Sequence, residues 1–341
     1  MIWLTWRQFR VQAVTVLAGV AALAVVLSAT GPRLARLART NADVFDLLTR
    51  TDRNLYWAGV LLVAVAPAVI GAFWGAPLVA RELEAGTHQL AWNQSVTRTR
   101  WLATKLGVLT LASAVAAGAL TLAVSWWSSP LDGAMSSTRG NLPPRLTPVT
   151  FAMRGIVPVG YTVFALLLGV TLGIVLRRSL PAMAITLALL VAVQIAVPLW
   201  VRPHLVTPIR TMVTISGSTL DEIRGDDRGR ALALGVTIHQ PDAWILTNQT
   251  VDAAGKAVAL PSWFTGCVPP PAAPGEVEHQ AGRGALDACL ARLNAEGYRQ
   301  QVVYQPASRF WPLQWAETGL FLAGSGLLAG LCLWWTRKRL T

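Results

Sequence analysis

Residues 155–176 read GIVPVGYTVFALLLGVTLGIVL, a run of 22 residues without Asp, Glu, Lys or Arg. A helix needs about 20 apolar residues to cross a bilayer core about 30 Å thick. Five more stretches are long and apolar enough to cross a bilayer, and Glu317 is the only acidic residue in any of them. They are residues 11–29, 55–75, 102–127, 180–200 and 313–335. The sequence therefore predicts an all-α polytopic membrane protein with six transmembrane helices.

The composition supports a membrane protein that also carries one modest soluble module. Hydrophobic residues make up 53% of the 341 residues and charged residues 13%, against about 25% charged residues in soluble domains. We expect a membrane domain at 1–200, a module at 201–312, and a sixth helix with a basic tail at 313–341. The net charge of +12 is spread over loops on both sides of the predicted membrane. This spread argues against a nucleic-acid partner and leaves lipids as the surroundings.

The positions of Lys and Arg predict the orientation, because cytoplasmic loops are enriched in both. One side carries eleven cations: Arg7, Arg10, Arg81, Arg98, Arg100, Lys105, Arg177, Arg178, Arg337, Lys338 and Arg339. The short loops of the other side carry eight: Arg33, Arg36, Arg39, Arg50, Arg53, Arg139, Arg145 and Arg154. Both termini are therefore expected in the cytoplasm. Scarce Lys and abundant Arg and Ala suggest a GC-rich genome, and hence a bacterial plasma membrane.

Two local patterns describe the membrane part more closely. Residues 1–10 place Trp3 and Trp6 at helical spacing among basic residues, which predicts a short helix in the inner interface. The alternative is a signal peptide, but no clear A-x-A site follows. Three G-x-x-x-G pairs, which allow close helix packing in lipid, begin at Gly71, Gly169 and Gly326.

The segment 201–312 is richer in charged residues, Gly and Pro than the rest of the chain and predicts a small extracellular α+β module. Residues 243–251 and 301–304 have strand-like composition, and 257–260 could pair with the first as a hairpin. Residues 285–295 predict an amphipathic helix that ends at Gly297.

Cys267 and Cys289 are the only cysteines outside the predicted spans. If the module faces outward, a disulfide between them is expected. It would contribute roughly 3 kcal/mol in the chain-entropy model. The alternative is a pair of free buried thiols.

No catalytic motif occurs in the chain. Gly255-Lys256 is followed by Ala257 and does not match a phosphate-binding loop, and neither G-x-S-x-G nor H-E-x-x-H is present. His204, His239 and His279 show no metal-ligand spacing. We therefore expect no enzyme activity, no metal and no cofactor in this chain itself.

The most informative loop follows the second predicted span: residues 81–105 read RELEAGTHQLAWNQSVTRTRWLATK. This loop resembles that of the ABC-2 type transporter permeases, in which an E-x-G-T-type stretch, a P/S-V-[ST]-R turn and a Lys opening span three follow one another. Glu84, Gly86 and Thr87 match the first part, residues 95–98 the second and Lys105 the third. The chain departs from the family in having Ser95 where many members have Pro, and in its large outer module.

The resemblance implies that loop 81–101 forms a coupling helix that docks on a separate ATP-binding subunit. The candidate docking residues are Arg81, Glu82, Glu84, Gly86, Thr87, Leu90, Trp92 and Arg98. The resemblance further implies two ATP-binding subunits, which bind ATP and Mg, and a second permease, either another copy or a related chain. The alternative is a solvated loop that only links two spans.

Two polar residues within the spans are candidates for the transport path. Glu317 lies near the outer end of span six, and its alternative role is simply to reach headgroup water. Gln194 in span five is expected to form a hydrogen bond between helices. A path this apolar suggests an amphiphilic or lipid-like substrate and, with the family resemblance, an ATP-driven exporter. The rivals are a polytopic enzyme acting on lipids and a receptor whose outer module binds a ligand.

Overall fold

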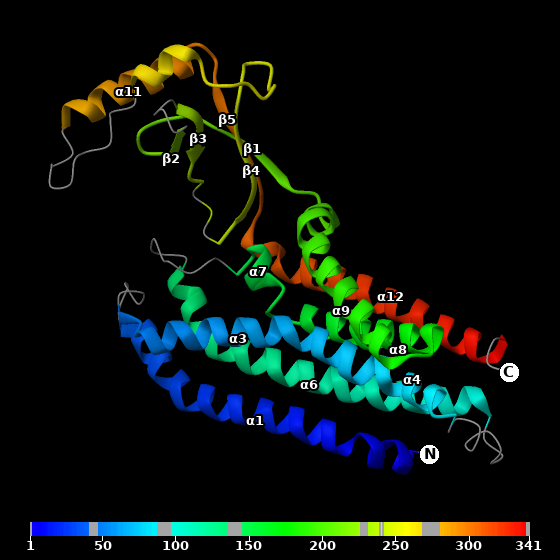
Figure 1. Ribbon diagram of the computed structural model, residues 1–341. Helices are drawn as coiled ribbons and strands as arrows, with labels where there is room; N and C mark the ends of the chain where they lie inside the picture. Colours follow the sequence, from blue (N-terminus) through cyan, green and yellow to red (C-terminus); the bar gives the residue numbers. More distant parts are fainter. Residues whose placement is uncertain are drawn as a thin grey trace. The chain divides into compact units, whose positions relative to one another are not determined.

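The computed structural model describes residues 2–40, 47–86, 97–135, 145–225, 231–238, 240, 242–267 and 280–338. Predicted coupling residues Thr87, Leu90 and Trp92 lie outside these ranges. The chain divides into a membrane unit, Met1–Val206 with Phe310–Thr341, and a strand unit, Thr207–Arg309 (Figure 1).

Six helical stretches of the described residues are long and apolar enough to cross a membrane. The stretches are Phe9–Thr40, Arg50–Glu84, Arg98–Leu131, Val157–Leu176, Ser179–Leu205 and Ala307–Lys338. These stretches confirm the predicted six-span helical architecture. The helices that form them are α1 (Ile2–Thr40), α3 (Arg50–Val69), α4 (Ala76–Glu84), α6 (Arg98–Met135), α8 (Val157–Leu176), α9 (Ser179–Ala196), α10 (Arg202–Leu205) and α12 (Phe310–Lys338).

Two of the spans contain a π-helical turn. The π-helix η1 (Ile70–Gly75) joins α3 to α4, and η2 (Val197–Val201) joins α9 to α10. Pro198 sits at the start of η2, where a missing backbone N–H disturbs the α-helical ladder. Both spans therefore remain continuous while changing their helical pitch.

Two predicted boundaries differ from the structure. Residues 2–40 form one unbroken helix, so a separate N-terminal helix before the first span is wrong; its interfacial location stays a prediction. The strand unit is narrower than 201–312, because Arg202–Leu205 continues the fifth span and α12 already begins at Phe310. Phe310 and Trp311 lengthen α12 before its predicted start at Leu313, and the fifth span continues through Arg202, whose charge suggested the boundary, to Leu205.

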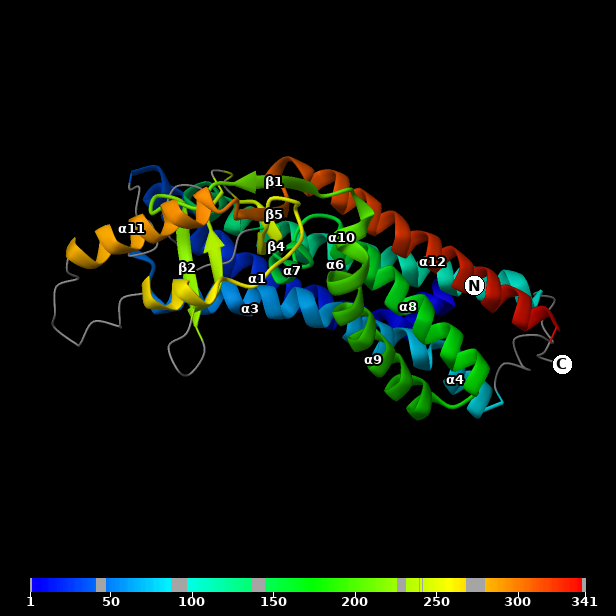
Figure 2. The same cartoon turned by 90° about the horizontal axis from the view of Figure 1, so that it is seen from above.

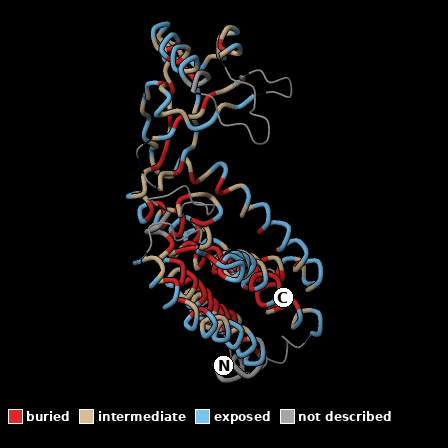
Figure 3. The backbone as a smooth tube through the Cα atoms, turned by 90° about the vertical axis from the view of Figure 1, so that its left-hand side faces the viewer, coloured by how far each residue is buried: buried red, intermediate tan, exposed pale blue. Residues whose placement is uncertain are grey.

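Helix α8 is the centre of the membrane unit. Most of its residues are buried, and it packs against α3, α4, α6, α9 and α12. Viewed from above, α8 lies between α9 and α12 (Figure 2), and the buried segments run inside the helix bundle (Figure 3). A helix that is apolar all round is expected in such an interior position.

Glycines bring the second span and α8 into backbone contact. A Cβ at Gly71 would lie 2.7 Å from the carbonyl oxygen of Ala165, and one at Gly169 would lie 2.8 Å from the backbone nitrogen of Ala76. Gly75 and Gly173 are equally tight against backbone carbonyls of the facing helix. Two of the three G-x-x-x-G pairs therefore pack against each other, whereas Gly326 and Gly330 of the third have open space beside them.

The strand unit contains a three-stranded antiparallel sheet in the order β1-β5-β4 and a β2-β3 pair. The strands are β1 (Ile209–Val213), β2 (Leu220–Gly225), β3 (Ala231–Val236), β4 (Trp244–Val251) and β5 (Arg299–Gln305). Helix α11 (Gln280–Ala295) packs through Leu290 and Leu293 into a core with Ile215, Leu234 and Phe264. The predicted disulfide joins Cys267 to Cys289 of this helix.

Sequence patterns identified part of this unit. Strands β4 and β5 and helix α11 lie where strand and helix were predicted, although α11 begins five residues earlier, at Gln280. The predicted hairpin at 257–260 is reduced to a single bridge between Val251 and Ala257. The two ends of the unit are joined, since Arg309 Nη1 donates to the carbonyl oxygen of Thr207 and β1 pairs with β5.

The glycine contact predicts a position-specific effect of adding one methyl group. We expect Gly169→Ala to destabilise the membrane unit by roughly 1–3 kcal/mol, the usual cost of overpacking, because the new Cβ meets the backbone of the second span. The matched control is Gly326→Ala, where nothing lies within 4 Å. Thermal unfolding followed by tryptophan fluorescence in mild detergent measures both. Equal melting temperatures for the two variants would contradict the packing.

Candidate functional site

A charged pair is completely buried in the membrane unit. Arg202 Nε donates to Glu317 Oε2 at 2.7 Å, and Arg202 Nη2 donates to Glu317 Oε1 at 3.0 Å. Both side chains are 0% exposed. This two-pronged geometry is the strong form of an ion pair, and it is needed to offset the cost of removing both charges from water.

The other polar atoms of the pair are also satisfied. The Tyr161 hydroxyl donates to Glu317 Oε1 at 3.2 Å, and Arg202 Nη1 donates to the carbonyl oxygen of Pro148 at 3.0 Å. The guanidinium carbon of Arg202 lies 4.3 Å from the ring centre of Phe151, in the short helix α7 (Pro148–Phe151). The ion pair therefore links α7, α8, α10 and α12.

Gln314, one turn before Glu317 on α12, caps the N-terminus of α8. Its Oε1 accepts hydrogen bonds from the backbone nitrogens of Ile156 at 2.9 Å and Val157 at 3.0 Å, and its Nε2 donates to the carbonyl oxygen of Phe151 at 3.2 Å. Helix α8 has no capping side chain of its own. A helix start leaves N–H groups unpaired, so a side chain from α12 supplies the acceptor.

Gly155 makes room for this cap. Its φ is +69°, a backbone conformation that residues other than glycine rarely adopt. A Cβ at this position would lie 2.6 Å from Gln314 Oε1. The carbonyl oxygen of Gly155 accepts from the Thr121 hydroxyl of α6 at 3.2 Å.

A second group of polar contacts lies at the other end of the bundle, where α4 ends. Glu82 of α4 forms an ion pair with Lys105 of α6, and the Lys105 ammonium lies 4.6 Å from the centre of the Trp101 ring. Residues 85–97 separate α4 and α6 in sequence. The pair therefore joins the helices on either side of this segment.

Glu84 caps α9 from outside that helix. Its Oε1 accepts from the backbone nitrogen of Ser179 at 2.8 Å, and its Oε2 accepts from the Ser179 hydroxyl at 2.6 Å. The residue at the N-cap position, Arg178, makes no side-chain cap. A carboxylate at a helix N-terminus satisfies N–H groups and complements the helix dipole.

Comparison with known families assigns the chain to a family of membrane proteins. Residues 11–202, more than half of its length, match the model of the family described as ABC-2 membrane transporter related. The chain belongs to this family. No curated protein and no solved structure matched it. ABC-2 permeases are in general non-catalytic membrane subunits of transporters that work with a separate ATP-binding subunit.

The predicted coupling residues of this ABC-2 permease that the structure describes divide into two groups. Glu82 and Glu84 pair within the chain, with Lys105 and Ser179. Arg81 is exposed, Gly86 follows the C-cap of α4 with a φ of +68°, and Arg98 begins α6. Docking of any of them on a partner stays a prediction.

The transport-path candidates have distinct surroundings. Glu317 is fully buried in the ion pair, which differs from the alternative of a glutamate reaching headgroup water. Gln194 Nε2 donates to the carbonyl oxygen of Ala64 at 2.9 Å, so it makes the hydrogen bond between α9 and α3 that sequence predicted. Arg202 was not predicted as a site residue, because it was placed in the outer module. The sequence did contain a signal for this ion pair: Arg202 follows the fifth predicted span, and Glu317 is the only acidic residue within the predicted spans.

The buried pair predicts a non-additive mutation cycle. Arg202→Met and Glu317→Leu should each cost roughly 3–5 kcal/mol, because each leaves an uncompensated buried charge. The double variant Arg202→Met/Glu317→Leu should be more stable than either single variant, since no charge remains. Melting temperatures in mild detergent measure the cycle. A double variant as unstable as the sum of the singles would contradict a direct pairing.

Proposed function

We propose that this ABC-2 permease is the membrane subunit of an ATP-driven exporter, and that loop 81–101 docks on a separate ATP-binding subunit. The observation that carries the proposal is the pair of contacts at the base of this loop, Glu82 to Lys105 and Glu84 to Ser179. A solvated linker needs no such fixation. A loop that transmits force requires firm attachment to the helices that it moves.

The contacts offer a physical route from the loop into the bundle. A displacement of the loop is passed by Glu84 to the start of α9 and by Glu82 to α6. Because α4 also packs on α8, the central helix follows. Closure of two ATP-binding subunits, which bind ATP and Mg, would in this way rearrange the bundle toward the outside. A second permease, identical or related, completes the path.

An amphiphilic or lipid-like substrate fits the chemistry of the spans. The buried pair is fully neutralised, and Gln194 is bonded to backbone. The remaining mid-span side chains are largely apolar, which offers little to a hydrophilic ion that must be coordinated as it leaves water.

In the proposed orientation both termini lie in the cytoplasm of a bacterial cell and the strand unit lies outside. Five candidate spans precede this unit, which supports a location on the side opposite the N-terminus. The disulfide between Cys267 and Cys289 supports the outer side, because disulfides persist in oxidising compartments.

Purification of the tagged chain from its native membrane tests the proposal directly. We expect a P-loop ATPase to co-purify in about equal amount, because the proposed loop docks one ATP-binding subunit per permease. Quantitative mass spectrometry of the eluate measures the ratio. A folded chain that elutes without any ATPase would contradict the assignment.

The transmitting role of Glu84 predicts loss of transport without loss of assembly. In proteoliposomes, Glu84→Ala should reduce ATP-dependent movement of a fluorescent phospholipid severalfold while the ATPase still co-purifies. Ser179→Ala should have a smaller effect, since its backbone N–H still donates to Glu84. Glu222→Ala in the strand unit is the control, because Glu222 pairs only with exposed Arg224 among its described contacts. Normal transport by Glu84→Ala would refute the proposed route.

A further inference from the structure

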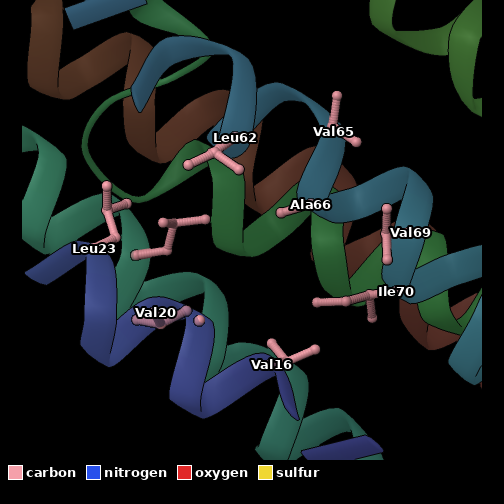
Figure 4. Close-up of a pocket in the computed structure, with 10 residues that line it drawn as sticks. Val16, Val20, Leu23, Leu62, Val65, Ala66, Val69 and Ile70 are labelled. Carbon is pink, nitrogen blue, oxygen red and sulfur yellow. The ribbon is translucent and has the colours of Figure 1, made fainter. Parts of the chain in front are cut away.

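An apolar cavity of about 250 Å³ lies between α1, α3 and α6. Figure 4 shows Val16, Val20 and Leu23 of α1 opposite Leu62 and Ala66 of α3, with Ile70 of η1 beside them. Every residue that lines the cavity is apolar. It is separate from the buried ion pair and from the contacts at the base of loop 81–101, none of whose residues line it.

The cavity exists because α1 is held against its neighbours on either side of it. Toward the N-terminus, Phe9 and Ala13 pack with Ile70 and Trp74. Toward the C-terminus, Leu27 and Leu34 join a cluster that includes Tyr56 and Val63 of α3. Side chains therefore close the helices at both ends of the cavity, and the space between the two clusters remains unfilled by the protein.

Gly19 keeps this space open. Glycine inside a helix costs roughly 0.5–1 kcal/mol relative to alanine, and in this membrane unit Gly71 and Gly169 offset that cost by close helix contact. Gly19 makes no such contact, since nothing lies within 4 Å of a Cβ built on it. The missing side chain leaves room in the wall of the cavity.

The location decides what fills the cavity. Its residues belong to the apolar candidate spans Phe9–Thr40, Arg50–Glu84 and Arg98–Leu131, so the surroundings are hydrocarbon, and an apolar cavity of this kind does not hold water. At about 30 Å³ for a water-sized group, the volume accommodates about eight methylene groups. Exposed Arg10 precedes Val16 by six residues, about 9 Å along a helix, and offers a positive charge to a phosphate at the interface.

We propose that this cavity binds one acyl chain of an anionic phospholipid, whose headgroup lies at Arg10 in the leaflet beside the N-terminal end of α1. Binding requires neither the ATP-binding subunit nor a direction of transport. It therefore goes beyond the proposed function and can fail or hold independently of it.

Photolabelling of the purified full chain tests the proposal without the ATPase. The probe is phosphatidylglycerol with a diazirine near the end of one acyl chain, incorporated in nanodiscs. Peptide mass spectrometry should locate adducts in residues 16–23 and 62–70. Gly19→Leu fills the space and should reduce these adducts at least five-fold, whereas the control Gly326→Leu, on an exposed face of α12, should leave them unchanged.

Further arms separate the possible results. Arg10→Gln should remove any preference for phosphatidylglycerol over the equivalent phosphatidylcholine probe. If Gly19→Leu does not fold, Ala66→Leu narrows the cavity from the α3 side and should give the same loss. Adducts spread evenly over all lipid-facing helices, or unaffected by both variants, would overturn the proposal. So would efficient chain-to-chain cross-linking through Gly19→Cys, which would show that a second copy occupies the cavity.

Discussion

The starts of two central helices depend on side chains from elsewhere in the chain. Gln314 accepts hydrogen bonds from the first N–H groups of α8, and Glu84 does the same for α9. At the buried start of α8 an unpaired backbone N–H would cost several kcal/mol, since no water can replace the lost partner. The contact of Glu84 with Ser179 is exposed, so it attaches α4 to α9 without rescuing a buried group. Neither helix has a capping side chain of its own. The position of α12 relative to α8 is therefore fixed by backbone hydrogen bonding as well as by apolar packing, and the Glu84 cap adds a directional contact between α4 and α9.

The ion pair adds a second constraint at the same end as the Gln314 cap. Arg202 and Glu317 expose no surface, so a substrate can reach either group only after α10 and α12 separate. The close contacts through Tyr161 and Pro148 mean that such a separation also releases α7 and α8. In the observed structure the Arg202–Glu317 pair and its hydrogen-bond partners hold four helices together and do not form an open binding surface. Any role in transport requires a second arrangement of these helices.

The sequence predicted the architecture of the membrane unit well, because long apolar runs are a strong signal. It also predicted the interhelical hydrogen bond of Gln194 and the disulfide. Of the three G-x-x-x-G pairs found in the sequence, two form tight helix contacts. It did not predict Arg202, because the charged residue follows an apolar run and so resembles the start of a loop. Strands β1 to β3 were missed because their sequences, such as LDEIRG in β2, lack a regular apolar alternation. Partners such as Glu84 and Ser179 are 95 residues apart, and no local pattern identifies contacts of that range.

The strand unit begins and ends at neighbouring points. Its first and last strands pair with each other, Ile209 opposite Tyr304, and Arg309 reaches back to the carbonyl oxygen of Thr207. The family match ends at Arg202 and does not include this unit. A domain whose two ends meet can be inserted into a loop without moving the helices on either side. The strand unit can therefore be enlarged, exchanged or deleted during evolution while the packing of the membrane helices is preserved.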